Sequence, residues 1–132
     1  MQIFQKSIVK KYLNTIDKAK LEGAYAKFKE IYSYDKIQTI KTLKEEAYDA
    51  EFLSDIFVNV LNYTLPPDNN YNLKRQYKNK IDSKTCDGAI LKDDYALAII
   101  ELKSTATKDL KAVTDQAFNY RNNQPNCKYI IT

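Results

Sequence analysis

The sequence predicts a mixed α/β fold with one hydrophobic core, and three patterns lead to that prediction. Apolar residues recur at helical spacing in the first third of the chain. Three short apolar or alternating runs, with turns between them, then predict strands, and a second helical segment precedes a last apolar run. With 132 residues, of which 44% are hydrophobic and 29% charged, the chain can bury one core and has an ordinary globular composition.

Residues 1–41 are predicted to form a helical extension that precedes the core of the domain. Their apolar residues follow one another at steps of three and four, at Ile3, Phe4, Ile8, Tyr12, Leu13 and Ile16. The same spacing continues after Gly23. Lys6, Lys10 and Lys11 also lie in this extension, and we interpret them as a solvated charged face. The predicted core then spans residues 42–132.

The first helix of the core is predicted to begin at Thr42. The sequence TLKE, from Thr42 to Glu45, is a capping box, in which the hydroxyl and the carboxylate satisfy reciprocal backbone donors. The sequence LPPD at 65–68 ends the helix. At about 100° per residue, Glu46 falls near the centre of the apolar stripe, whereas Glu51 points away from it. The stripe itself comprises Ala50, Leu53, Phe57 and Leu61.

Three strands, a helix and a last strand are expected to follow. Alternation over 71–77 predicts the first strand, and the apolar runs 89–91 and 95–100, with a polar turn at 92–94, predict a hairpin. Residues 108–121 return to helical spacing, and 127–132 is a strand that the helical crossover makes parallel to its neighbour. Because this last apolar strand is expected to be central and runs to the C-terminus, we expect the natural polypeptide to continue past Thr132.

Composition excludes several classes of enzyme. The chain has no histidine, which removes the Ser-His-Asp triad, the Cys-His pair, the HExxH zinc site and nucleases with a histidine base. Cys86 and Cys127 lack metal-site spacing. No stretch approaches the roughly 18 apolar residues of a membrane helix, and no signal peptide is evident, so a cytoplasmic location is expected. The net charge of +4 is a mild surplus that permits a polyanionic partner.

A group of charged residues at the predicted hairpin carries the chemistry. Glu101 and Lys103 are two residues apart on one strand, so they project from the same face. Asp87 lies at the start of the preceding strand. A hairpin loop with an odd number of residues, such as 93–95, places Asp87 opposite Glu101 on that face, whereas an even loop does so only if a β-bulge intervenes.

Two carboxylates this close repel each other unless a cation lies between them. Mg²⁺ suits such a site because it needs one or two carboxylates, with waters and phosphate completing its shell, and Mn²⁺ is an alternative. The amine of Lys103 could orient or deprotonate a water, or neutralise charge that develops on a scissile phosphate. A phosphodiester hydrolase of this kind needs no histidine.

This arrangement resembles the PD-(D/E)xK nuclease superfamily, whose core is a helix, a three-stranded antiparallel meander, a helix and a strand. The resemblance covers residues 42–132. It implies that Asp87 and Glu101 hold the metal, that Lys103 is catalytic and that the carbonyl of Leu102 joins the metal shell. Many members also carry a metal-site glutamate on the first core helix, and the inward phase of Glu46 makes it the candidate here. Some place a Gln and a Tyr four apart on the next helix, as Gln116 and Tyr120 are.

More narrowly, the sequences CDGAI, ELKS and QAFNYRNNQP look similar to the N-terminal nuclease domain of single-chain, type IIG-like restriction-modification enzymes. Cys86 departs from the pattern, since it stands where the superfamily name has Pro. The resemblance implies a type II site-specific deoxyribonuclease module that cuts double-stranded DNA. It also implies a downstream methyltransferase that uses S-adenosylmethionine, followed by a target-recognition region. Cutting both strands with one such site needs either dimerisation or two sequential encounters.

Other readings stay open. An E-x-K triplet with an upstream Asp is common by chance. The fold could act only as a DNA- or protein-binding module, and a junction resolvase or repair nuclease would carry the same residues. Glu46 could be a solvated first-turn acid that favours the helix dipole, and Tyr120 could simply belong to the core. Three basic residues of the first strand could either contact phosphate or be solvated: Lys74, Arg75 and Lys78.

Overall fold

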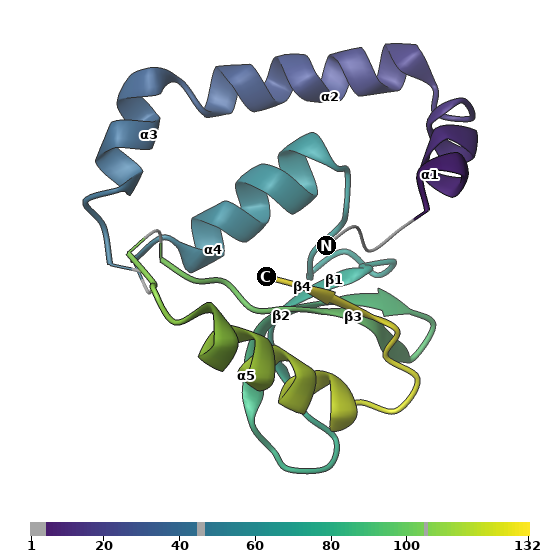
Figure 1. Ribbon diagram of the computed structural model, residues 1–132, viewed down its shortest axis with the longest axis vertical. Coiled ribbons are helices and arrows are strands. Elements are labelled where there is room, and N and C mark those ends of the chain that lie inside the picture. The colour runs from purple at the N-terminus through teal and green to yellow at the C-terminus, as the bar shows by residue number, and fades with distance from the viewer. Residues whose placement is uncertain (1–4, 45–46, 105) are drawn as a thin grey trace.

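The computed structural model describes residues 5–44, 47–104 and 106–132, which form a mixed α/β fold as predicted (Figure 1). The helical extension comprises α1 (Lys6–Leu13), α2 (Lys18–Ile31) and α3 (Tyr34–Ile40). A helix then begins as α4 (Asp49–Phe52) and continues as η2 (Leu53–Val60). The remaining elements are β1 (Leu73–Lys78), β2 (Thr85–Lys92), β3 (Tyr95–Ile100), α5 (Leu110–Asn122) and β4 (Tyr129–Ile131).

The four strands form one sheet in the order β1-β2-β3-β4. The antiparallel meander of β1, β2 and β3 is confirmed, and so is the parallel pairing of β4 with β3. The expectation that the last strand is central is wrong for the sheet that the structure describes. Since β2 already occupies one side of β3, β4 adds to the other side and forms an edge.

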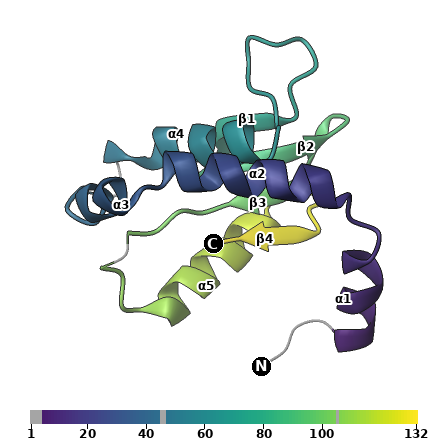
Figure 2. The ribbon, with the colours of Figure 1, turned by 90° about the horizontal axis from the view of Figure 1, so that it is seen from above.

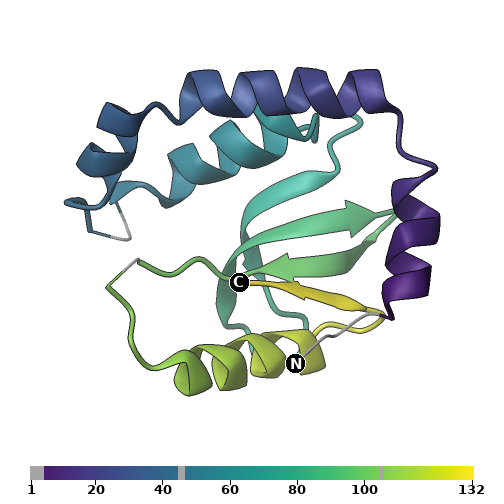
Figure 3. The ribbon, with the colours of Figure 1, turned by 45° about the horizontal axis from the view of Figure 1, so that its top comes forward.

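The sheet lies between two helical layers (Figures 2 and 3). On one face, Leu53 and Phe57 of η2 pack against buried residues of the sheet, among them Leu73 and Ile100. On the other face, Tyr120 of α5 belongs to a second buried cluster, which also contains Cys86, Ile99 and Cys127. The helix α2 runs along the outer side of η2 and contacts it (Figure 3). Burial of these apolar side chains supplies the main driving force for the arrangement.

The predicted capping box is not the start of the core helix. Helix α4 begins at Asp49, and Thr42 lies in the turn after α3, where its hydroxyl donates to the carbonyl of Thr39 at 2.7 Å. A short hydroxyl side chain can bond to a preceding carbonyl as readily as cap a following helix, so the sequence pattern was ambiguous. Glu45 and Glu46, the acids of this prediction, lie outside the residues that the structure describes.

The buried face of this helix differs in part from the predicted stripe. Leu53 and Phe57 are buried as predicted, but Leu61 is 51% exposed, and Val60 is buried in its place. Residues 53–60 form a π-helix, whose hydrogen bonds join each residue to the fifth along the chain, and Leu61 lies just beyond its end. Asp55 of this helix is also buried, where Lys36 and Tyr48 donate to it.

The predicted helices of the extension are confirmed, and two begin at residues whose side chains cap them. Asp17 accepts from the amides of Ala19 and Lys20, and Ser33 accepts from the amide of Lys36. None of the three helices has a buried residue, so their apolar side chains form exposed patches. In the part of the chain that the structure describes, the helices are too short or too polar to span a membrane.

Candidate active site

The register of the β2–β3 hairpin decides which charged residues meet. Lys92 pairs with Tyr95, so the loop contains two residues, which is the even case of the two that the sequence left open. The β-bulge that this case requires is present: Ile90 pairs with Ala98 while Leu91 pairs with Ala96, which leaves Leu97 as the extra residue. The register after the bulge pairs Gly88 with Ile100. Asp87 and Glu101 follow one step further, opposite each other on one face.

Asp87 is tied to the strand that carries the other two charged residues. Its Oδ2 accepts a hydrogen bond from the amide of Leu102 at 2.7 Å. The neighbouring Gly88 is buried because η2 packs closely on the sheet here: a Cβ at this position would lie 3.4 Å from the side chain of Leu53. The amide of Leu102 therefore contacts the predicted metal ligand, and the role of its carbonyl stays a prediction.

Glu101 is the most buried charged residue of this cluster, with 3% of its surface exposed. Its amide donates to the carbonyl of Ile131 in β4 at 2.9 Å, which fixes the backbone. Its Oε1 accepts from Lys103 Nζ at 2.8 Å and from Gln116 Nε2 at 2.6 Å. A carboxylate removed from water needs such charge-assisted bonds, so Lys103 and Gln116 explain how it is tolerated.

Gln116 connects the site to α5. Its Nε2 lies 3.4 Å from the hydroxyl of Tyr120, one turn further along the helix. Tyr120 is also buried in the cluster with Cys86 and Ile99. The structure thus brings both residues of the predicted Gln–Tyr pair to the site, and Tyr120 belongs to the core at the same time.

The donor set fits a hard divalent cation. Asp87 and Glu101 supply two carboxylates at the same end of the sheet, and Mg²⁺ needs no more than one or two from the protein. Among the described residues, no group of three His, Cys, Asp or Glu side chains is positioned to hold a metal. Glu46, the predicted third carboxylate, lies outside that part of the chain. The described residues therefore offer a two-carboxylate site whose remaining positions water and phosphate would fill.

A cavity of about 260 Å³ adjoins this cluster, and the sequence did not predict it. It lies between α3, α4 and the segment 102–104. Aromatic and aliphatic side chains line it, including Tyr32, Ile37, Tyr48 and Phe52, and Lys103 forms part of its wall. The residues come from both the extension and the core, and their separation in sequence explains why no local pattern revealed the cavity.

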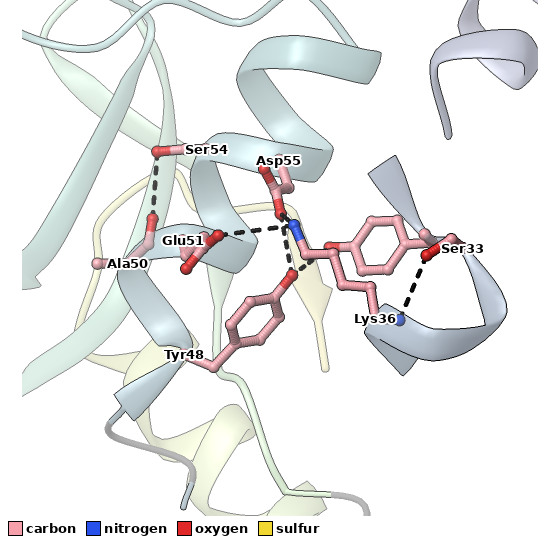
Figure 4. A network of polar contacts seen from close by, with 8 residues as sticks. Ser33, Lys36, Tyr48, Ala50, Glu51, Ser54 and Asp55 are labelled. Carbon is pink, nitrogen blue, oxygen red and sulfur yellow. Dashed lines mark hydrogen bonds and ion pairs between the residues drawn. The ribbon is translucent and has the colours of Figure 1, made fainter. Parts of the chain in front are cut away.

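A buried polar network behind the cavity was also missed (Figure 4). Asp55 of η2 is 8% exposed and accepts from Lys36 Nζ and from the hydroxyl of Tyr48, both at 2.9 Å. The hydroxyl of Tyr48 in turn accepts from the hydroxyl of Tyr32 at 3.2 Å, because its own proton is donated to Asp55. The bond to Asp55 raises the pKa of Lys36, and burial raises the pKa of Tyr48. The sequence did contain one signal of this network, since Asp55 is an acidic residue between Leu53 and Phe57 in an otherwise apolar helix.

The basic residues of β1 point into solvent. Lys74, Arg75 and Lys78 are exposed, and the guanidinium of Arg75 donates to the hydroxyl of Ser54.

Comparison with known protein families, curated proteins and solved structures finds no match to this chain. The fold and the site thus define a mixed α/β domain with a buried glutamate, a lysine and a second acid clustered at one end of its sheet.

Proposed function

We propose that this chain is a PD-(D/E)xK-type nuclease domain that hydrolyses phosphodiester bonds of double-stranded DNA with Mg²⁺ or Mn²⁺. The observation that carries the proposal is the meeting of Asp87, Glu101 and Lys103 at one end of the sheet. The order of the core elements, a helix, an antiparallel meander, a helix and a parallel strand, supports it. Removing charged groups from water at the end of a buried strand costs free energy, and such groups gather at functional sites.

The chain's own residues would divide the work. A bound divalent ion supplies positive charge that offsets the charge developing on the phosphate and makes a coordinated water more acidic. Asp87 and Glu101 would hold that ion, and Gln116 keeps the Glu101 carboxylate in one orientation. Lys103, 2.8 Å from Glu101, would position the attacking water and donate hydrogen bonds to the phosphate.

The narrower proposal is a cleavage module of a cytoplasmic restriction-modification enzyme of the type II, single-chain kind. Its support is the sequence resemblance of CDGAI, ELKS and QAFNYRNNQP together with the position of these segments around the cluster. Such an enzyme would carry a methyltransferase and a target-recognition region in the same polypeptide. The reading frame that follows codon 132 in the gene is the direct test, because an NPPY-type motif there would identify the methyltransferase.

Cleavage of duplex plasmid DNA with Mg²⁺ tests the nuclease proposal. We expect Lys103→Ala to lower the rate about 100-fold or more, because a positioned proton-transfer group contributes that much. Lys108→Ala is the matched control, since Lys108 is an exposed lysine a few residues away, and we expect its rate to stay within about twofold. Equal rates for wild type and Lys103→Ala would contradict the role of Lys103.

Calorimetric titration with Mn²⁺ separates metal binding from catalysis. We expect Asp87→Asn to lose the binding that the wild type shows, whereas Asp94→Asn, in the exposed hairpin loop, should retain it. Metal-independent binding of DNA without cleavage would instead favour a DNA-binding module. The absence of both metal binding and cleavage in the full-length protein would contradict the proposed function.

A further inference from the structure

We propose that the cavity beside Lys103 binds an unstacked nucleobase of the nucleotide next to the scissile phosphate. This inference rests on the proposed nuclease function and names a substrate feature for it. The cavity is about 260 Å³, slightly below the roughly 300–1,000 Å³ of pockets for small organic ligands. That space suits one planar base and excludes a base pair. The occupant must therefore leave the duplex stack or come from a single strand.

The walls offer the surface that a base needs. Tyr32, Tyr48 and Phe52 supply aromatic surface, and Ile37 and Ile40 supply aliphatic surface. Stacking on aromatic side chains stabilises any of the four bases, because each has a π-face. Tyr48 and Phe52 meet edge to face with ring centroids 6.3 Å apart, so they are held as a pair.

The charged residues that line the cavity are complementary to a nucleotide. Lys41, Lys44 and Lys103 line it, with Asp49 as the acid among the described lining residues. These lysines suit the phosphates on either side of an extruded base. Ser104 adds a hydroxyl next to Lys103, which could pair with a polar edge of the base.

The position of the cavity relative to the cluster selects which nucleotide enters. Lys103 belongs to both places: it lines the cavity and contacts the carboxylate of Glu101 at 2.8 Å. The predicted metal site and the cavity thus share one residue. A base in the cavity would belong to the nucleotide that adjoins the phosphate at the site. A duplex with a bulged or mismatched nucleotide would present such a base at the lowest cost.

The polar network behind the cavity keeps its wall in place before any ligand binds. Tyr48 donates to Asp55 and accepts from Tyr32, and Lys36 binds Asp55 across the boundary between α3 and η2. Figure 4 shows Lys36 and Tyr48 converging on Asp55. A wall that is already ordered costs less entropy when a base enters, which favours binding.

Fluorescence anisotropy with labelled DNA tests this inference, with Ca²⁺ in place of Mg²⁺ to prevent cleavage. The probes are a paired duplex, the same duplex with a one-nucleotide bulge, and that bulge with an abasic nucleotide. We expect the bulge with a base to bind about tenfold more tightly than the abasic bulge, since stacking on the cavity wall needs the base. Equal affinity of wild type for both bulges would overturn the inference.

Two matched variants locate the effect. Ile37 lines the cavity and is 37% exposed, and Val9 lies on α1 and is 38% exposed. We expect Ile37→Glu to reduce the tenfold preference for the base to within about twofold, and Val9→Glu to retain it. Retention of the preference by a folded Ile37→Glu variant, verified by thermal melting, would also overturn the inference. If the wild type cuts duplex DNA with Mg²⁺ but binds both bulges equally, the nuclease proposal holds and the proposal about the cavity fails. If it neither binds nor cuts DNA, both proposals fall.

Discussion

Cys86 shows how a buried side chain changes the response of the protein to pH. The thiol is fully buried, 3.2 Å from the carbonyl of Gly88 and close to the acids of the cluster. Burial is the main reason why the pKa of this thiol rises from 9.0 to about 12, and the charge of Glu101 adds to it. The folded protein therefore holds this proton more tightly than the unfolded chain does.

We expect the free energy of unfolding to fall as the pH rises from 9 towards 12. The stabilising contribution of the protonated thiol is complete below the unfolded pKa and is lost as pH approaches the folded pKa. Urea denaturation at several pH values in this window measures the slope. Cys86→Ala should lower stability at neutral pH but make the slope shallower. An unchanged slope in that variant would show that other groups cause the loss.

The site residues differ in how far the sequence could predict them. Glu101 and Lys103 share a face because side chains alternate along a strand, a rule that needs no knowledge of the fold. Asp55 could not be placed in the same way, because its burial depends on a partner, Lys36, nineteen residues away. The same holds for Gln124, which is buried and donates to Asn79 at 2.9 Å. Long-range polar pairs leave no periodic signal in the sequence.

At the scale of elements, the hairpin of β2 and β3 depends on a compensation between its loop and its bulge. The two-residue loop alone would place Asp87 and Glu101 on opposite faces of the sheet. The extra residue, Leu97, shifts the pairing of the strands by one position and so brings Asp87 and Glu101 to the same face. The sequence predicted the two strands. It was compatible with an odd-numbered loop and with an even-numbered loop plus a bulge, because neither the loop nor the bulge has a distinctive composition here.

Deletion of Leu97 and an insertion beyond the bulge test this register. Without Leu97, the two-residue loop and a regular ladder retain every cross-strand pair, so Asp87 and Glu101 should stay opposite each other and the free energy of unfolding should stay close to that of wild type. One glycine inserted between Ile99 and Ile100 instead moves Glu101 one position along the strand and turns it towards the face occupied by η2. We expect this insertion to cost about 3 kcal/mol or more, because a buried carboxylate would lose its partners. Thermal and urea denaturation measure both variants, and equal stability of the two would contradict the register argument.

At the scale of the whole molecule, charge is divided unevenly between the extension and the core. Residues 1–41 contain nine of the 21 basic and four of the 17 acidic side chains, which gives this segment a net charge of +5. The remaining residues are close to neutral, at −1. Any attraction of the protein for a polyanion over distance would therefore come from the extension, while the candidate site contributes short-range chemistry.

The extension is joined to the core through the Lys36–Asp55 pair, and this link can be tested. We expect Asp55→Ala to lower the free energy of unfolding by about 1–3 kcal/mol, because Lys36 and Tyr48 lose a buried acceptor. Glu51→Ala is the control: Glu51 lies 3.6 Å from the same lysine but its side chain is 60% exposed, so the cost should be below about 1 kcal/mol.

Limited trypsin digestion provides the second measurement for this pair. Loss of Asp55 should expose lysines of the extension to faster cleavage, because α2 and α3 would separate more often from η2. The Glu51→Ala variant should be cut at the wild-type rate. Equal digestion rates for the Asp55→Ala variant and wild type would show that apolar contacts between α2 and η2 alone hold the extension.

The bond between Glu101 and the last strand has a consequence for the order of events during translation. The Glu101 amide is satisfied by the carbonyl of Ile131, thirty residues later in synthesis. A nascent chain that has left the ribosome only as far as α5 cannot form this parallel pair. The charged cluster therefore acquires this backbone support only after β4 has left the ribosome, whereas the meander and η2 are able to fold earlier.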